Sequence, residues 1–137
     1  MRIFCDLNVI LDVLLDRKPF VQFSYKILEL AQSGEIELVM SAISIDTLAY
    51  ILKKNWKTTK EIRDIISKLL FLVDIAFVDK KIILDALKLD FNDLEDAIQC
   101  CSAFSDDCDL ILTRNKKDFL NCKLKVLTPE EFLDDKI

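Results

Sequence analysis

The chain has 137 residues, of which 52% are hydrophobic and 31% charged, with a net charge of -5 and no histidine. This length fits one globular domain whose core needs neither a disulfide nor a structural metal to fold. The lack of histidine excludes a serine–histidine triad, an imidazole base and histidine metal ligands. The single glycine, Gly34, excludes a P-loop and a G-x-G-x-x-G turn. Carboxylates, thiols and hydroxyls are the remaining catalytic groups.

Short apolar runs alternate with segments of helical period along the chain. Strands are predicted at 1–5, 37–40, 74–78 and 109–113, with a weaker strand at 125–127. Helices are predicted at 9–15, 20–32, 44–54, 58–72, 80–88 and 93–105, and a last helix begins at Pro129 after the N-cap residue Thr128. This alternation predicts an α/β fold in one domain over 1–137: a three-layer α/β/α sandwich around a mainly parallel sheet of four to five strands.

Neither a membrane segment nor a secretory signal is evident in the sequence. The longest apolar run, 69–78, is interrupted by Asp74 and is shorter than the roughly 20 residues that a membrane helix needs. Asp6 comes before the apolar core of a signal peptide could form. Five cysteines without a C-x-x-C pair favour free thiols over a disulfide framework or a zinc site. We therefore expect a cytoplasmic protein.

Polar residues follow the predicted strands, and ligands bind beyond the carboxyl ends of the strands in an open parallel sheet. Ser41 and Asp79 are interpreted as caps of the helices that follow them. Asp6 needs a different interpretation, because Asn8 is available to cap the helix that starts at Val9. Asp6 is therefore the first candidate functional residue.

The predicted helix 93–105 carries a second candidate, Asp96. This side chain shares a helical stripe with Cys100 and Ala103, where a carboxylate is only partly solvated and invites a cation or a specific hydrogen bond. Asp93 and Glu95 are better explained as acids that favour the first turn of a helix. The face predicted to pack on the sheet is Leu94, Ala97, Ile98 and Cys101, and the predicted polar face is Glu95, Gln99 and Ser102.

Two further regions allow two interpretations each. Asp46, early in a predicted helix, is either a site residue or a complement to the helix dipole. Asp118 lies near Arg114, Lys116 and Lys117, which form either an ordinary surface charge cluster or a basic rim around an acidic pocket. Five large side chains are either core or interface residues: Phe20, Phe23, Tyr25, Ile27 and Trp56.

The segments 3–12, 41–46, 93–99, 113–119 and 127–133 resemble the PIN-domain ribonucleases of the VapC-like type. This family includes the toxin halves of many bacterial toxin–antitoxin pairs. The resemblance runs essentially from end to end of the chain. It implies a PIN-like fold and an endoribonuclease that depends on Mg²⁺ or Mn²⁺, with RNA as substrate, an antitoxin as partner and a homodimeric state.

The resemblance also implies roles for individual residues. Asp6, Asp46, Asp96 and Asn115 would hold the metal as the first to fourth positions of the site, and Asp118 would join them as a catalytic residue. The second position is more often glutamate in this family and the fourth is frequently aspartate. The implied residues for substrate binding are Asn8, Thr113, Arg114, Lys116 and Lys117.

Oxygen ligands alone can hold Mg²⁺ or Mn²⁺ for phosphodiester hydrolysis, so this chemistry needs no histidine. One alternative is a PIN-like interaction module whose site has decayed, because Asp46 and Asn115 depart from the family pattern. A second alternative is a receiver-type phospho-acceptor domain. It fits less well, because Cys5 precedes Asp6 where receivers have an acidic pair.

Overall fold

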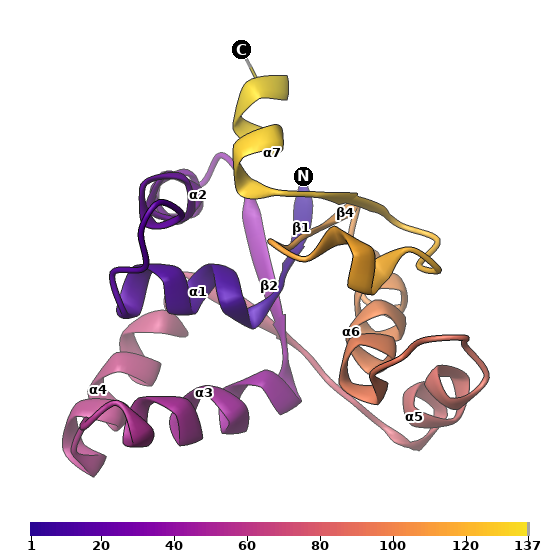
Figure 1. Ribbon diagram of the computed structural model, residues 1–137, viewed down its shortest axis with the longest axis horizontal. Coiled ribbons are helices and arrows are strands. Elements are labelled where there is room, and N and C mark those ends of the chain that lie inside the picture. Colours follow the sequence, from indigo (N-terminus) through magenta and orange to yellow (C-terminus); the bar gives the residue numbers. More distant parts are fainter. Residues whose placement is uncertain (137) are drawn as a thin grey trace.

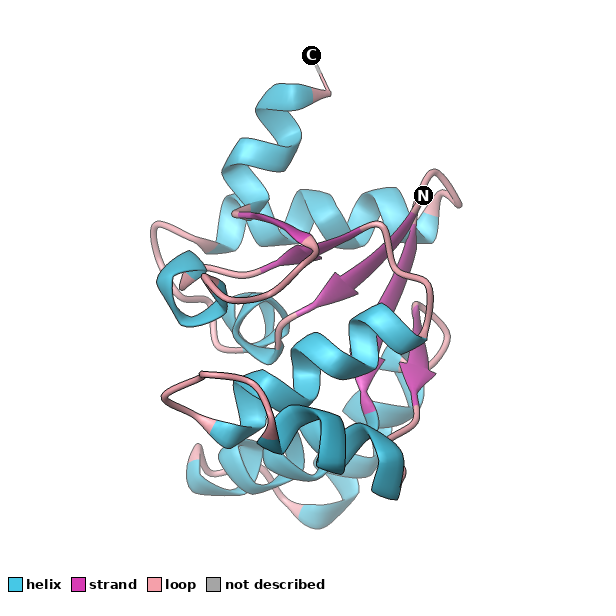
Figure 2. Ribbon diagram, turned by 90° about the vertical axis from the view of Figure 1, so that its right-hand side faces the viewer, coloured by secondary structure: helices cyan, strands magenta, loops and turns pink. Residues whose placement is uncertain are grey.

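The computed structural model describes residues 1–136 as a five-stranded sheet with helices on both faces (Figures 1 and 2). All strand pairs are parallel, and the strand order is β3-β2-β1-β4-β5. This arrangement confirms the predicted α/β/α sandwich. The strands are β1 (Arg2–Cys5), β2 (Glu37–Ser41), β3 (Val73–Ala76), β4 (Leu110–Leu112) and β5 (Lys125–Leu127).

The helices lie close to the segments that the apolar periodicity predicts. Capping boxes at Thr58 and Thr128 and a capping bond from the amide of Ile82 to Asp79 fix three of the helix starts. Ser41 occupies the N-cap position of the helix that follows it, as predicted, but its hydroxyl makes no capping bond. The helices are α1 (Leu7–Leu14), α2 (Val21–Gln32), α3 (Ala42–Lys54), α4 (Thr59–Leu69), α5 (Lys80–Leu87), α6 (Leu94–Ser105) and α7 (Pro129–Asp135), with a short 3-10 helix η1 (Lys116–Phe119).

The core is divided by the sheet into two layers, because successive side chains of a strand point to opposite faces. Ile3 and Leu38 contribute to the larger layer, under α1 to α4, whereas Phe4 and Val39 contribute to the layer under α6. Figure 1 shows α1 to α4 on one side of β1 and β2, with α5 and α6 on the other. The continuous apolarity of the strands follows from this burial on both faces.

Helix α6 lies between the sheet and α5, and this position corrects its predicted orientation. Ala97 and Ile98 pack against Ile82 and Ala86 of α5, not against the sheet. The sheet is contacted by the small side chains Cys100 and Ala103 of the other stripe. A pattern that assumes one buried face fails for a helix covered on two sides. Gln99 and Ser102, predicted as polar surface, are buried, and Leu94, predicted as core, is exposed.

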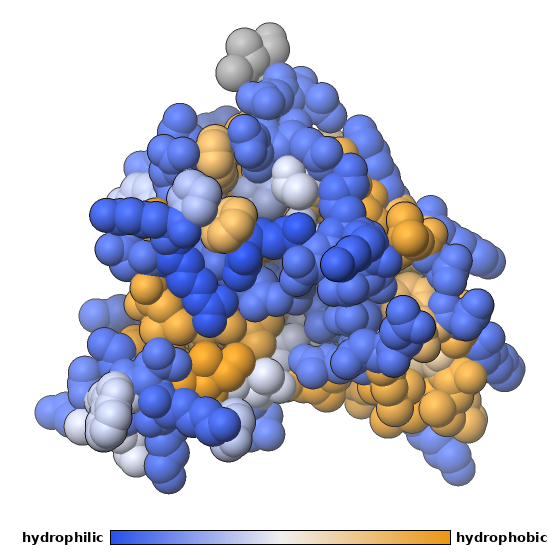
Figure 3. All heavy atoms as spheres, viewed as in Figure 1, coloured by the Kyte–Doolittle hydropathy of each residue, from blue (hydrophilic) through white to orange (hydrophobic). Residues whose placement is uncertain are grey.

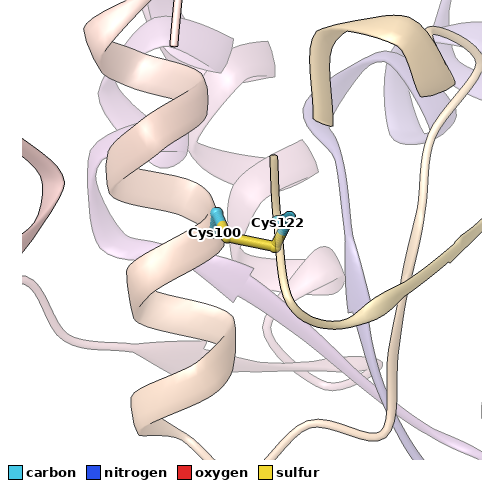
Figure 4. Close-up of a disulfide and its surroundings, with 2 residues drawn as sticks. All are labelled: Cys100 and Cys122. Atoms are coloured by element: carbon cyan, nitrogen blue, oxygen red, sulfur yellow. A yellow bond between two sulfur atoms is a disulfide. The ribbon is translucent and has the colours of Figure 1, made fainter. Parts of the chain in front are cut away.

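Two of the five cysteines form a disulfide, which corrects the expectation of free thiols. Cys100 of α6 is bonded to Cys122, and their Cα atoms lie 5.9 Å apart (Figure 4). The two residues are 22 positions apart in sequence, so their spacing gave no sign of the pairing. Cys5, Cys101 and Cys108 are free.

Apolar side chains also reach the surface. Figure 3 shows hydrophobic residues gathered over the α5 and α6 side, where Leu87 and Phe104 are exposed. Of the five large side chains assigned to core or interface, Ile27 lies in the core, while Phe20, Tyr25 and Trp56 are exposed. Within residues 1–136, none of the helices is long and apolar enough to cross a membrane.

Candidate active site

Asp6 and Thr113 meet at the carboxyl ends of two neighbouring strands, β1 and β4. The backbone N–H of Asp6 donates to the carbonyl of Leu112 at 2.9 Å, which extends the pairing of these strands by one residue. The hydroxyl of Thr113 then donates to Oδ2 of Asp6 at 2.8 Å. Parallel pairing therefore brings together two residues that are 107 positions apart in sequence.

Thr113 orients the residues around it from a fully buried position. Its Oγ1 donates to Asp6 and also accepts a hydrogen bond from the backbone N–H of Asn115 at 3.1 Å. Thr113 was predicted to bind substrate, but its side chain is buried and its hydroxyl donates to Asp6. Asn115, which is partly exposed, is held beside this pair through its backbone.

Burial dominates the electrostatics of Asp6, whose exposed fraction is 6%. Loss of hydration raises the pKa of this carboxyl, while the hydrogen bond from Thr113, the backbone amides of Asn8 and Leu7, and the charge of Arg114 act in the opposite direction. The structure corrects the predicted cap, because α1 begins at Leu7 and Asp6 itself, not Asn8, occupies the N-cap position. Asn8 contributes its backbone N–H to the surroundings of the carboxylate.

Asp96 lies in the first turn of α6, where its backbone N–H donates to the Asp93 side chain at 3.2 Å. Burial and neighbouring negative charges raise the pKa of Asp96 to about 7. After burial, the strongest contributions come from Asp93, Asp6, Asp118 and Glu95, in that order. We refer to Asp6, Asp96 and Asp118 as the acidic site, because the three carboxylates, from three separate segments, act on one another electrostatically.

A small hollow of about 180 Å³ is lined by two of the three residues of the acidic site. Asp93, Asp96 and Asp118 line it together with Lys117 and Asn121. The hollow is bordered by α6 and η1, so it lies where carboxylates of these two elements face each other. A polyanionic substrate entering here meets one lysine and several acids, which calls for a cation to offset the repulsion.

Asp46, the candidate for the second acidic position, lies elsewhere. It is exposed on α3 and lines a groove against α4 with Tyr50, Lys53 and Arg63. It is absent from the main charges that act on Asp96. Asp96 and Asp118 therefore line one hollow, Asp6 acts on Asp96 through its charge, Asn115 lies beside Thr113, and Asp46 lines a different groove.

The basic residues near the site differ in what they contact. Nε of Arg114 lies 2.8 Å from Oδ2 of Asp12, and its guanidinium stacks over the ring of Phe20 at 4.3 Å. Lys116 donates to both carboxylate oxygens of Glu131 at 3.0 Å. Lys117 is exposed and makes no ion pair within residues 1–136. It is the lysine of this group that is available to a ligand.

Sequence reasoning missed Asp12, whose side chain is completely buried in α1. Burial raises the pKa of this carboxyl, and Arg114 and Arg17 offset part of the effect. The sequence contains one signal for this residue: Asp12 is an acid inside the apolar run Val9 to Leu15. A buried charge needs a partner, so this position indicated an ion pair. Asp12 holds Arg114 in place directly after Thr113.

Carboxylate oxygens are the donors that hard divalent cations prefer. Among residues 1–136, however, no group of three or more acids or cysteines stands close enough to form a ready-made metal site. The strongest charges acting on Asp96 are all negative, whereas Arg114 offsets part of the effect of burial at Asp6. The carboxylate oxygens of the acidic site are donors of the kind that hold a divalent cation.

The fold and the site together define the class of this protein. A parallel α/β/α sheet with carboxylates at the carboxyl ends of its central strands is the arrangement implied by the resemblance noted in the sequence. The PIN domain family matches residues 2–117, and the chain belongs to this family.

Individual relatives agree with this assignment. Ribonuclease VapC1 from Aquifex aeolicus (strain VF5) is 32% identical over 136 residues, which cover 97% of this chain and 94% of that protein. VapBC2 from Rickettsia felis bound to a DNA fragment from its promoter contains a chain with a TM-score of 0.69 and 16% identity, covering 93% of this chain and 98% of that one. A chain of VapBC-1 from nontypeable Haemophilus influenzae has a TM-score of 0.70 and 20% identity, with coverages of 95% and 99%. These structures confirm the predicted PIN-like fold.

Proposed function

We propose that this protein is a VapC-like endoribonuclease that hydrolyses phosphodiester bonds of RNA with the help of Mg²⁺ or Mn²⁺. The observation that carries the proposal is that Asp96 and Asp118 line one hollow, and that the charge of Asp6, which is hydrogen-bonded to Thr113 at the ends of β1 and β4, also acts on Asp96. The identity of 32% with a protein named Ribonuclease VapC1 supports the same activity.

The cation is assigned to the acidic site. Asp6 and Asp96 would supply charged oxygen ligands, with Asn115 beside them and Asp118 facing Asp96 across the hollow. When bound, the ion would supply a water of lowered pKa and neutralise charge on the phosphate. Thr113 keeps Asp6 oriented through its hydrogen bond, and that bond offsets part of the rise in the pKa of Asp6 that burial causes.

The substrate backbone is assigned to Lys117. Among the predicted basic contacts, Arg114 is engaged by Asp12 and Lys116 by Glu131, whereas Lys117 lines the hollow and is exposed. A lysine at this place suits a phosphate next to the scissile bond. Arg114 and Lys116 then have mainly structural roles.

The partners follow from the same proposal. Proteins of similar fold include VapBC2 bound to a DNA fragment from its promoter and a toxin–antitoxin complex from Klebsiella pneumoniae, which supports an antitoxin partner for this chain. We assign it the role of the toxin, acting on RNA in the cytoplasm as a homodimer. Sedimentation of the isolated chain would measure the oligomeric state.

Cleavage of a panel of labelled RNAs tests the activity directly. We expect cleavage with Mg²⁺ or Mn²⁺, no cleavage in a chelating buffer, and a loss of at least about 100-fold in rate for Asp6→Asn, since an electrostatic group at the reacting centre is worth that much. Asp46→Asn tests the predicted ligand that lies outside the acidic site. Because Asp46 is exposed in a different groove, we expect near-normal cleavage by this variant.

The decayed interaction module remains the second candidate. The observation in its favour is that the part of the chain described, 1–136, contains no ready-made group of three metal ligands. The interaction module would be favoured if the wild-type protein cleaves none of the RNAs and if neither Asp6→Asn nor Asp96→Asn changes any binding measurement.

A further inference from the structure

The disulfide between Cys100 and Cys122 joins the two elements that carry opposing carboxylates. Cys100 lies on α6 four residues after Asp96, and residues at that spacing are neighbours on a helix surface. Cys122 follows η1, the 3-10 helix that carries Asp118. Figure 4 shows the bond running from the α6 ribbon to the loop after η1. The covalent link is therefore attached one helical turn from the acidic site.

Few other interactions hold α6 and η1 together. Phe119 of η1 packs in the same core cluster as Cys100 and Ala103. Within residues 1–136, no hydrogen bond or ion pair joins α6 to η1. Asn121 Nδ2 donates to the carbonyl of Asp90, which fastens the loop after η1 to the segment before α6. Apart from packing and this one hydrogen bond, the disulfide is the connection that keeps η1 against α6.

One carboxylate on each of the connected elements also repels the other. Asp118 on η1 and Asp96 on α6 are like charges that act on one another across the hollow. Opening the disulfide removes a constraint that opposes this repulsion, so η1 with Asp118 is freer to move away from α6. A cation that uses carboxylates from both elements then has a less organised site to bind.

We propose that the Cys100–Cys122 disulfide is a redox latch of the acidic site, which holds Asp118 near Asp96 and couples cation binding to the thiol–disulfide state of the protein. This inference rests on the proposed function, because it assigns a regulation to the cation site described there. Persistent disulfides are uncommon in reducing compartments, where those that occur are usually transient and redox-sensing.

The switching reaction is thiol–disulfide exchange with a dithiol reductant. Cys122 is partly exposed and Cys100 is only 5% exposed, so a thiolate of the reductant attacks Sγ of Cys122. The S–S bond breaks, and Cys100 leaves as a thiolate that takes up a proton. The second thiolate of the reductant then attacks its own sulfur in the mixed disulfide and releases Cys122 as a thiol. Two electrons pass from the dithiol to the protein, and an oxidised dithiol reverses the reaction.

The first test is the pairing itself. The full chain is purified without reductant, alkylated under denaturing conditions and mapped by mass spectrometry. We expect Cys100 and Cys122 to be linked and the other three cysteines to be alkylated. Five alkylated cysteines in the untreated protein would overturn the proposal.

The second test compares Mn²⁺ binding by calorimetry before and after treatment with dithiothreitol. We expect the reduced protein to bind Mn²⁺ at least about tenfold more weakly, which is about 1.4 kcal/mol, and reoxidation with oxidised dithiothreitol to restore the affinity. Far-UV circular dichroism verifies that the reduced protein stays folded. Equal affinities of the oxidised and reduced protein, or no Mn²⁺ binding by either, would contradict the latch.

Two serine variants serve as a matched pair. Cys122→Ser should bind Mn²⁺ like the reduced wild type whether or not reductant is present. Cys101→Ser, which changes the partly buried free thiol next to Cys100, should respond to reductant like the wild type. A redox-dependent Mn²⁺ affinity without RNA cleavage by either form would support the latch while contradicting the ribonuclease, so the two proposals fail separately.

Discussion

Replacing Asp96 with asparagine should stabilise the protein at pH 8 in a chelating buffer. Burial and neighbouring carboxylates raise the pKa of Asp96 from 3.8 to about 7. A carboxyl whose pKa is raised by folding favours the folded state below its unfolded pKa, and this contribution is lost as the pH rises through the folded pKa. At pH 8 the folded chain therefore carries an ionised Asp96 among like charges, which asparagine removes while keeping the shape of the side chain.

The size of the effect follows from the raised pKa and from the exposure of the side chain. At about 1.36 kcal/mol for each pKa unit, the whole rise in the pKa of Asp96 corresponds to about 4 kcal/mol of free energy. Asp96 is partly exposed, so solvent screening reduces this value, and we expect a gain of about 1 to 2 kcal/mol in the free energy of unfolding. The gain should vanish near pH 4, where wild-type Asp96 is protonated in the folded protein.

Urea unfolding of the two proteins at pH 4 and pH 8 measures this difference. Asp64→Asn, which removes an exposed acid from α4, is the matched control and should change stability by less than about 0.5 kcal/mol. Addition of Mn²⁺ should stabilise the wild type more than Asp96→Asn, because the cation relieves the same repulsion. An Asp96→Asn protein that is less stable than the wild type at pH 8 in chelator would refute the picture of converging, uncompensated carboxylates.

Three further substitutions probe the surroundings of the acidic site. Thr113→Val should cost about 1 to 3 kcal/mol in urea unfolding, because it leaves an oxygen of the buried Asp6 without its hydrogen bond; an unchanged midpoint would contradict this. Asp12→Asn should cost about 2 to 4 kcal/mol in the same assay, because Arg114 loses the charge of its buried partner; a loss below about 0.5 kcal/mol would show that the pair contributes little. Lys117→Ala should raise KM for RNA several-fold and leave the melting temperature unchanged, because Lys117 is exposed; an unchanged KM would remove Lys117 from the substrate contacts.

Much of the fold follows from local sequence signals. The apolar runs around Ile3, Leu38 and Ile111 predict buried parallel strands, and β5 coincides with its predicted bounds. Thr58 and Thr128 mark helix starts through capping boxes that the structure contains. These signals act over a few residues, so they are readable without knowledge of the tertiary contacts.

The errors arise where tertiary packing decides. Gln99 and Ser102 are buried although periodicity places them on a polar face, and Ala97 and Ile98 pack on α5, since periodicity carries no information on a second covering layer. The disulfide of Cys100 depends on the approach of a loop 22 residues away. In both cases the decisive neighbour is distant in sequence.

The candidate site was predictable in part. The topology of a parallel sheet brings Asp6 and Thr113 together at the ends of adjacent strands, so their strand-end positions indicated the location. The sequence places Asp46 early in a helix, but it does not show on which side of that helix α4 packs. The structure places Asp46 in the groove between α3 and α4. Asp12 was missed because its partners, Arg17 and Arg114, are recognisable only after folding.

Calorimetric titration of Mn²⁺ into the wild type and into Asp6→Asn tests most directly whether the carboxylates of Asp6, Asp96 and Asp118 form one cation site. We expect saturable binding to the oxidised wild-type chain and an affinity at least about tenfold lower for Asp6→Asn, since one charged ligand is lost from a site with few neutralising groups. Equal affinity of the two proteins would contradict a cation site built on Asp6.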